Sequence, residues 1–130
     1  MKVLQPPKWP RPKGYSNGLI AQGAPVFLSG IVGWNSRGEF ECKDFAGQVA
    51  QALKNIVEIL AEAKARPEHI ARMTWYVVDK HEYLNAAKEI GASYREIIGR
   101  HYPAMSVVEV SGLVEADARV EIEVTAVVPD

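Results

Sequence analysis

The chain has 130 residues, of which 48% are hydrophobic and 24% charged, and its formal net charge is −1 at pH 7. This composition is typical of one globular domain with its own core, and the small net charge excludes an overall positive field that would attract nucleic acid or anionic lipid. No apolar run approaches the roughly 20 residues of a membrane helix and the amino terminus lacks the apolar centre of a signal peptide, so we expect a cytoplasmic protein without nucleic-acid or membrane partners.

The amino-terminal part of the chain is rich in proline, with four of the eight prolines before Gly14. Proline fixes φ and removes a backbone donor, so this composition predicts an extended arm over residues 1–13, followed by a single domain over residues 14–130. Residues 15–22 and 26–29 are predicted to form two short strands. The intervening Gly23-Ala24-Pro25 is typical of a hairpin turn that would pair them.

A loop of glycine and small polar residues is predicted for residues 30–43 and leads into the first helix. Asp44 is the expected N-cap, and apolar side chains recur behind it at helical spacing as far as about residue 64. Cys42, the only cysteine, lies in the loop. Because it has no second cysteine to pair with, it forms neither an internal disulfide nor a thiolate metal site, and we interpret it as a tolerated thiol.

The middle of the chain predicts a strand over residues 70–78, following Pro67, and then a second helix. Asp79 and Glu82 have the spacing of a capping box at the start of this helix, and Gly99 marks its end. Its buried side is expected to consist of Leu84, Ala87, Gly91, Tyr94 and Ile98.

Two further strands are predicted, one over residues 105–110 and one beginning at Arg119. In the second, apolar residues alternate strictly with polar ones: Val120, Ile122, Val124 and Ala126 point one way, and Arg119, Glu121, Glu123 and Thr125 the other. The resulting order ββαβαββ predicts an α+β sandwich of two layers, with two helices on one face of a four- to six-stranded sheet.

The second face of this sheet is polar but also carries large side chains. Its expected members include Arg72, Thr74, Tyr76, Glu109, Glu121 and Glu123. A polar face meets either water or another copy of the sheet, and the large residues favour the second.

The sequence contains no GxSxG elbow, phosphate-binding glycine loop, CxxC pair or HExxH helix. His69, His81 and His101 are far apart in sequence, so we expect neither a metal site nor a cofactor. Trp34 stands in a loop of small and polar residues. Packing beneath the loop and forming an aromatic wall for a ligand are equal alternatives for this side chain.

Four segments together resemble the Rid family (reactive intermediate deaminases, also called YjgF or L-PSP proteins). They are residues 14–17, 26–30, 102–110 and 120–123, which read GYSN, VFLSG, YPAMSVVEV and VEIE. The resemblance implies a chorismate-mutase-like ββαβαββ fold assembled as a homotrimer with inward-facing sheets, and a small-molecule cleft between neighbouring subunits. In such a trimer Arg72, Glu109 and Glu123 would pair across the inner barrel.

The resemblance also implies an activity, the hydrolysis of short-lived enamines and imines such as 2-aminoacrylate to a ketoacid and ammonia. The site must hold the substrate carboxylate, protonate carbon or nitrogen, and deliver a water. Tyr15, Ser29 and Glu121 match the family's catalytic positions, with Gly30 and Ile31 beside the substrate. Glu121 is the expected acid/base, with a structural charge in the barrel as the equal alternative. Ser29 either donates to a bound oxygen or simply ends its strand.

Three cleft positions depart from the family pattern. The arginine that binds the substrate carboxylate corresponds to Met105, which has neither donor nor charge. A helix asparagine corresponds to Gly91, and a cysteine to Val107. Trp34, Phe27 and Met105 predict a more apolar cleft, which would accept a larger or less acidic molecule, such as an aromatic or muconate-like enamine. A replacement cation could come from a neighbouring subunit, with the candidates Arg37, Arg100 and Arg119.

Three functions are therefore weighed. A hydrolase of altered specificity is supported by Tyr15, Ser29 and Glu121. A trimeric metabolite-binding protein without catalysis is favoured by Met105 and Gly91. Ribonuclease activity, which the family name also carries, is disfavoured because the sequence has no basic stripe interleaved with aromatic residues and no histidine pair spaced for phosphodiester cleavage.

Overall fold

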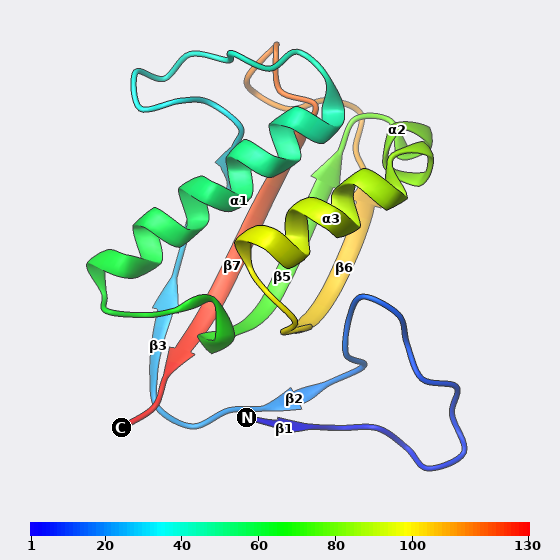
Figure 1. Ribbon diagram of the computed structural model, residues 1–130, viewed down its shortest axis with the longest axis vertical. Helices are drawn as coiled ribbons and strands as arrows, with labels where there is room; N and C mark the ends of the chain where they lie inside the picture. Colours follow the sequence, from blue (N-terminus) through cyan, green and yellow to red (C-terminus); the bar gives the residue numbers. More distant parts are fainter.

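A computed structural model describes residues 1–130 and has two layers, with helices over a mixed β-sheet (Figure 1). The five strands are β3 (Ala24–Phe27), β4 (Ile31–Val32), β5 (Ile70–Val77), β6 (Ala104–Glu109) and β7 (Val120–Val128). Their order is β3-β7-β5-β6, and β4 pairs with β7 next to β3. Only β5 and β6 are parallel. The predicted two-layer α+β class is confirmed.

Three helices cover one face of the sheet, α1 (Phe45–Glu62), α2 (Lys80–Asn85) and α3 (Ala87–Ile97), and a short 3-10 helix spans Pro67–His69. The expected N-cap of α1 is confirmed, because Asp44 accepts a hydrogen bond from the Gly47 N–H at 2.9 Å. Lys64, with φ of 56°, has already left the helical conformation. No helix combines the length and apolar character needed to cross a membrane.

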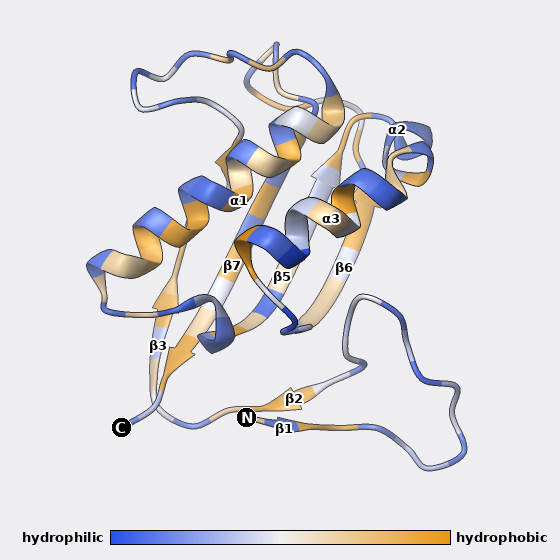
Figure 2. Ribbon diagram, viewed as in Figure 1, coloured by the Kyte–Doolittle hydropathy of each residue, from blue (hydrophilic) through white to orange (hydrophobic).

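The hydrophobic core lies between the helices and the sheet. In Figure 2 hydrophobic and hydrophilic residues alternate along α1 and α3, as expected of helices with one buried side. The alternation predicted for β7 is confirmed, since every second residue from Val120 to Ala126 is buried. On β5 the buried residues are Ile70, Met73, Trp75 and Val77. These contacts fix which side of each strand faces away from the helices.

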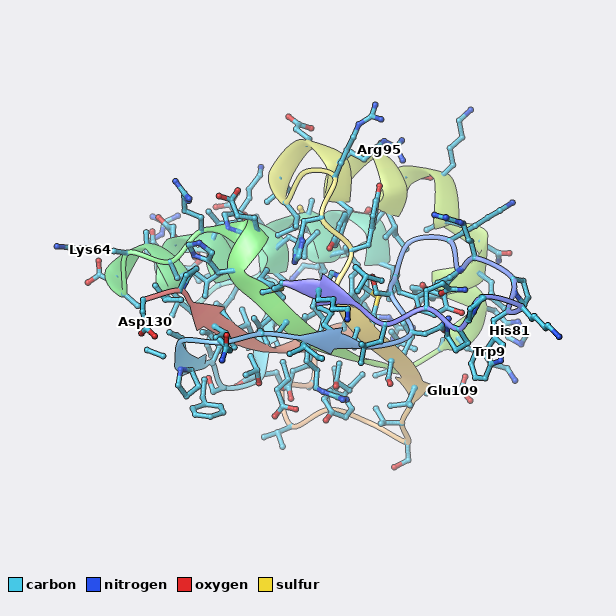
Figure 3. All side chains as sticks on the ribbon, turned by 90° about the horizontal axis from the view of Figure 1, so that it is seen from below. Trp9, Lys64, His81, Arg95, Glu109 and Asp130 are labelled. Atoms are coloured by element: carbon cyan, nitrogen blue, oxygen red, sulfur yellow. The ribbon has the colours of Figure 1, made fainter.

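No helix covers the other face of the sheet, and Figure 3 shows side chains projecting from it. Phe27 is 75% exposed there and Val108 43%. Other members of this face include Arg72, Thr74, Tyr76, Ser106, Glu121, Glu123 and Thr125. This open face confirms the predicted mixture of polar and large residues, with one exception.

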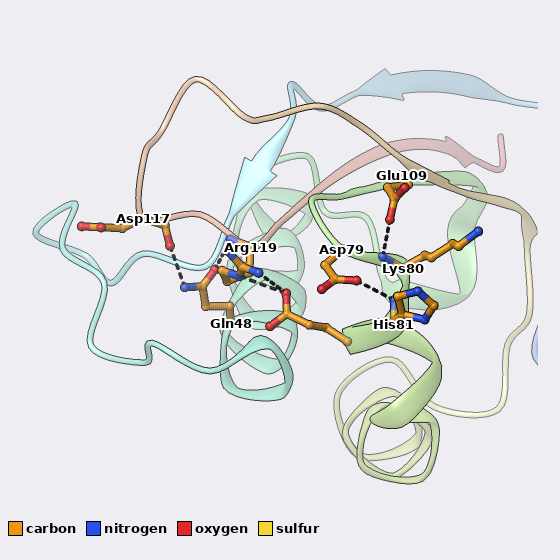
Figure 4. Close-up of polar contacts among 8 residues, drawn as sticks. Gln48, Asp79, Lys80, His81, Glu109, Asp117 and Arg119 are labelled. Atoms are coloured by element: carbon orange, nitrogen blue, oxygen red, sulfur yellow. Dashed lines mark hydrogen bonds and ion pairs between the residues drawn. The ribbon is translucent and has the colours of Figure 1, made fainter.

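The exception is Glu109, which was expected on the open face. It lies on the same side of β6 as Met105 and Val107, because side chains on a strand alternate. Its carboxylate accepts a hydrogen bond from the Lys80 N–H at 2.9 Å, at the start of α2 (Figure 4). An unpaired helix N–H thus attracts the carboxylate to the helix layer, and the expected place of Glu109 in an inner barrel is wrong.

The predicted hairpin near the amino terminus is also wrong. β2 (Leu19–Ile20) pairs with β1 (Lys2–Val3) in a separate two-stranded sheet, whereas β3 pairs with β7. Ala24 and Pro25 belong to β3 and do not form a turn. The long strand β7 offers this segment a partner, and Pro25 is tolerated because β3 is an edge strand.

The second helix is interrupted at Ala86, so that one predicted helix is two. Leu84 is 60% exposed, contrary to expectation, while Ile90 and Tyr94 are buried. Asp79 caps α2 by accepting from the His81 N–H at 2.9 Å. The capping box is incomplete, because the side chain of Glu82 is engaged by Arg119 instead.

Candidate functional site

Glu121, the candidate acid/base, lies at the edge of the sheet formed by β3 and β4. Ser29 and Gly30 form the link between these two short strands, and both are exposed. The Glu121 carboxylate lies directly against Gly30, so that any side chain at position 30 would overlap it. Ile31 follows in β4 and pairs with Ile122. The carboxylate therefore lies against backbone that carries no side chain, and Ser29 precedes this position in the chain.

A buried glutamine fixes the entry into β7, two residues before Glu121 (Figure 4). Gln48, fully buried in α1, donates to the carbonyl group of Asp117 at 2.9 Å and accepts from the Arg119 N–H at 2.7 Å. The Arg119 guanidinium in turn donates to Glu82 at 2.9 Å. Because all these polar groups are paired, the network holds this end of β7 in one position.

Trp34 follows β4. Its surroundings agree in part with packing beneath the loop and in part with an aromatic wall for a ligand, the two alternatives from the sequence. Its ring packs against Phe40 with centroids 6.2 Å apart, and its carbonyl group accepts from Asn55 at 2.8 Å. The indole is nevertheless 38% exposed and borders an open groove of about 830 Å³ together with Ile31 and Ile59. A ligand-binding role for Trp34 stays a prediction.

Tyr15 lies at the other edge of the sheet, beside the start of β6. Its neighbour Ser16 donates from the backbone to the Pro103 carbonyl at 2.9 Å and from the side chain to the Tyr102 carbonyl at 2.5 Å. These two bonds hold the segment against β6, where Ser16 bridges to Ala104. The Tyr15 side chain is 41% exposed, in a hollow that it shares with Tyr102.

Gly91 and Met105 line one cavity of about 380 Å³ between α3 and β6. Seven of its eleven lining residues are hydrophobic, and the aromatic ones are Trp75, Tyr83, Tyr94 and Tyr102. Val107 points to the same side of β6 as Met105 and packs against the core without lining the cavity. Gly91 and Met105, which correspond to an asparagine and an arginine of the family pattern, therefore border the same cavity.

Two tyrosines of this cavity, Tyr83 and Tyr94, have raised pKa values and stay neutral in the physiological pH range. Tyr94 stacks on Tyr102 with centroids 5.7 Å apart and donates to the His101 carbonyl at 2.6 Å. Burial raises the pKa of Tyr94 well above its ordinary value, with a smaller contribution from Tyr102. Burial also raises the pKa of Tyr83.

The open face contains a further perturbed tyrosine. Tyr76 donates to Glu123 at 3.3 Å. The negative charge of Glu123 raises the pKa of Tyr76 above its ordinary value, with smaller effects of burial, the hydrogen bond and Glu121. Tyr76 and the two glutamates therefore form a small acidic cluster on this face.

Two histidines serve local structure. His101 Nε2 lies 2.6 Å from the Ile70 carbonyl oxygen, and the Nδ1 of His69 accepts from the Arg66 N–H at 3.0 Å. His81 is exposed in the first turn of α2. No group of three or more potential metal-binding side chains occurs in the chain.

The predicted site residues fall into two groups at opposite edges of the sheet. Ser29, Gly30 and Ile31 lie at the β3/β4 edge beside Glu121 of β7, and β5 separates β7 from β6, as Figure 1 shows. Tyr15, Gly91 and Met105 lie at the β6 edge. A single chain therefore does not bring the two groups together.

Sequence reasoning missed one basic residue of the second group. Arg95 lines the cavity together with Met105, as does Lys13. Of the arginines proposed from the sequence, Arg37 pairs with Glu39 and Arg119 with Glu82, and neither lines this cavity; nor does Arg100. The sequence could have indicated Arg95 through its spacing from Gly91. Residues four positions apart in a helix lie on the same side, about one turn apart.

The chain resembles known proteins along most of its length. Residues 9–128 match the model of the family described as Endoribonuclease L-PSP. A RutC family protein from Aquifex aeolicus is 34% identical over 98% of this chain and 99% of its own length. A 2-iminobutanoate/2-iminopropanoate deaminase from Salmonella typhimurium is 31% identical over 81% of this chain and 80% of its own length.

Similar solved structures support the same relationship. The Rid family protein YyfB from Yersinia pestis, described as a protein of unknown function, has a TM-score of 0.85 and 29% sequence identity, covering 98% of each chain. Both the sequence and the fold therefore agree with the resemblance first found in the short segments. This chain belongs to the Endoribonuclease L-PSP family, which includes the proteins named Rid, YjgF and RutC.

Proposed function

We propose that this protein hydrolyses a small enamine or imine, with release of ammonia, in clefts between three copies of the chain. The observation that carries the proposal is the Glu121 carboxylate, which lies against Gly30 in an exposed link between two strands. A carboxylate next to bare backbone can position a water close to a bound substrate.

The division of the site supports assembly from several copies. If the β6 edge of one chain meets the β3/β4 edge of the next, Gly91 and Met105 of one subunit face Glu121 of its neighbour. Such a head-to-tail contact joins unlike surfaces and closes into a ring when the rotation permits. The open sheet face would then be buried, including Phe27.

The proposed reaction needs only proton transfers. The Glu121 carboxylate accepts a proton from water while the water oxygen bonds to the imine carbon, and it passes this proton to the nitrogen to give a neutral carbinolamine. The carboxylate then accepts the carbinolamine hydroxyl proton as the carbonyl group forms and the carbon–nitrogen bond breaks, and it delivers this second proton to the leaving nitrogen, which departs as ammonia. An enamine first takes a proton on carbon to give the imine.

The test is ammonia release from enamines and imines generated in situ, covering small and aromatic side chains. Wild-type protein is expected to exceed the background rate with at least one of them. Glu121→Gln, which keeps the size of the side chain but cannot accept the proton, should lower the rate by about a hundredfold or more. Equal rates for wild-type and Glu121→Gln protein would contradict the proposal.

A binding protein without catalysis is the second candidate, and Met105 favours it because methionine cannot hold a carboxylate by charge. In this case a metabolite raises the melting temperature and is recovered unchanged. Ribonuclease activity is not proposed, since the net charge of −1 offers no general attraction to RNA.

A further inference from the structure

The cavity beside Met105 contains a guanidinium group although Met105 itself carries no charge. Arg95 folds back along α3 over Gly91: a methyl group at position 91 would lie 3.2 Å from Arg95 Nη1. Side chains four residues apart share one side of a helix. The missing side chain at position 91 therefore leaves room for that of Arg95, which Figure 3 shows on the helix side of the molecule.

Arg95 has no acidic partner within the chain. The three ion pairs involve Arg37, Arg66 and Arg119. Lys13 approaches the same cavity from the amino-terminal segment. Two cations therefore border a cavity whose lining is otherwise mainly apolar, which is an arrangement that suits an anion with an apolar body.

Trp75 contributes to the aromatic wall of this cavity. Its side chain is 1% exposed and packs edge-on against the Tyr83 ring, with centroids 6.0 Å apart. Such a wall offers apolar contact to a flat group of a bound molecule.

We propose that Arg95 binds the substrate carboxylate and that the substrate carries an aromatic or bulky apolar side chain, which occupies the space between Met105 and the tyrosines. Arginine binds a carboxylate through two parallel hydrogen bonds, and aromatic walls favour a flat apolar group. The substrate class is thus an α-imino or enamino acid with a large side chain. This inference takes the imine or enamine group of the substrate from the proposed function. The binding of a carboxylate by Arg95 does not depend on that function.

Binding of 3-phenylpropanoate tests the inference without any turnover. This stable acid combines a carboxylate with a phenyl ring, and calorimetric titration of the wild-type protein is expected to show saturable binding. Two matched probes separate the contributions: propanoate lacks the ring, and 3-phenylpropanamide lacks the charge. Each is expected to bind about tenfold more weakly or worse.

Arg95→Gln is the decisive variant, because it removes the charge at an exposed position. It should weaken 3-phenylpropanoate binding about tenfold or more and leave binding of the amide unchanged. The matched control is Arg66→Gln, which removes a charge from a surface ion pair outside the cavity. This variant should bind 3-phenylpropanoate with the affinity of the wild type. Unchanged affinity in Arg95→Gln, equal affinity for acid and amide, or no binding of the acid by folded wild-type protein would overturn the inference.

The outcomes also separate this inference from the proposed function. If Arg95-dependent binding occurs but no enamine is hydrolysed, the proposed function fails and the assignment of Arg95 stands. If ammonia is released at equal kcat and KM by wild-type and Arg95→Gln protein, the hydrolase stands and the assignment of Arg95 fails.

Discussion

At the scale of single residues, the contact between Gly30 and Glu121 is the most sensitive feature of the candidate site. Gly30→Ala introduces one methyl group into the space that the carboxylate occupies. A displacement of about 1 Å in a reacting group commonly lowers the rate about a hundredfold, so we expect such a loss of kcat in ammonia release.

The matched control for Gly30→Ala is Gly112→Ala, where an added methyl group meets no atom within 4 Å. This variant should retain both the kcat and the melting temperature of the wild type. If Gly30→Ala is as active as Gly112→Ala, the position of the Glu121 carboxylate has no part in the reaction.

The buried tyrosines predict an alkaline titration. Burial raises the pKa of Tyr94 above the ordinary value of 10.0, so the folded state disfavours tyrosinate. The corresponding stability is complete below pH 10 and is lost as the pH rises through the pKa of the folded state. Absorbance at 295 nm should therefore show fewer of the five tyrosines ionising near pH 10 in native than in unfolded protein. Tyr94→Phe should remove the last component of the native titration, and an unchanged curve would contradict this assignment.

Only some of the contacts between site residues could be predicted from the sequence. Resemblance indicated Gly30 and Glu121, which lie in contact, and Gly91 and Met105, which share a cavity. It did not indicate Arg95. The place of that guanidinium depends on a long side chain folding back along a helix, and a sequence motif does not specify such a rotamer.

At the scale of elements, the N-cap of α1 carries a prediction for stability. Asp44→Ala removes the acceptor for the Gly47 N–H and should lower the free energy of unfolding by about 0.5–2 kcal/mol. Chemical denaturation at neutral pH measures the change. Asp44→Asn retains an acceptor oxygen and should lose much less, and an equal loss in both variants would exclude the cap as the cause.

The elements best predicted from the sequence are those with a long regular period. Nine residues in β7 and eighteen in α1 give clear alternation and helical spacing. The short edge strands were not predicted correctly, because the choice of partner for Ala24–Phe27 depends on β7, a hundred residues later. Glu109 was misplaced for a similar reason, since the free N–H of Lys80 that attracts it becomes its neighbour only after folding.

At the scale of the whole molecule, the open sheet face predicts the state of assembly. The wild-type protein should have a mass in solution of about three times the chain mass of 14.3 kDa. Phe27→Glu places a charge at a side chain that is 75% exposed, so the isolated chain should fold normally while the trimer dissociates.

Light scattering coupled to gel filtration measures the effect of Phe27→Glu. The control is Leu84→Glu, which makes an equivalent change on the exposed side of α2 and should leave the mass unaltered. A wild-type protein with the mass of one chain, or equal masses for both variants, would rule out assembly through this face.

Because the site is divided between two edges of one sheet, two variants that damage different edges should complement each other in a mixed trimer. A chain with Glu121→Gln keeps an intact β6 edge, and a chain with Arg95→Gln keeps an intact β3/β4 edge. The two impaired chains are mixed in equal amounts, unfolded and reassembled. At low substrate concentration the mixture should regain about a quarter of the wild-type activity, because about one cleft in four unites the two intact edges. Activity that stays absent in the mixture would mean that both residues serve a site within one chain.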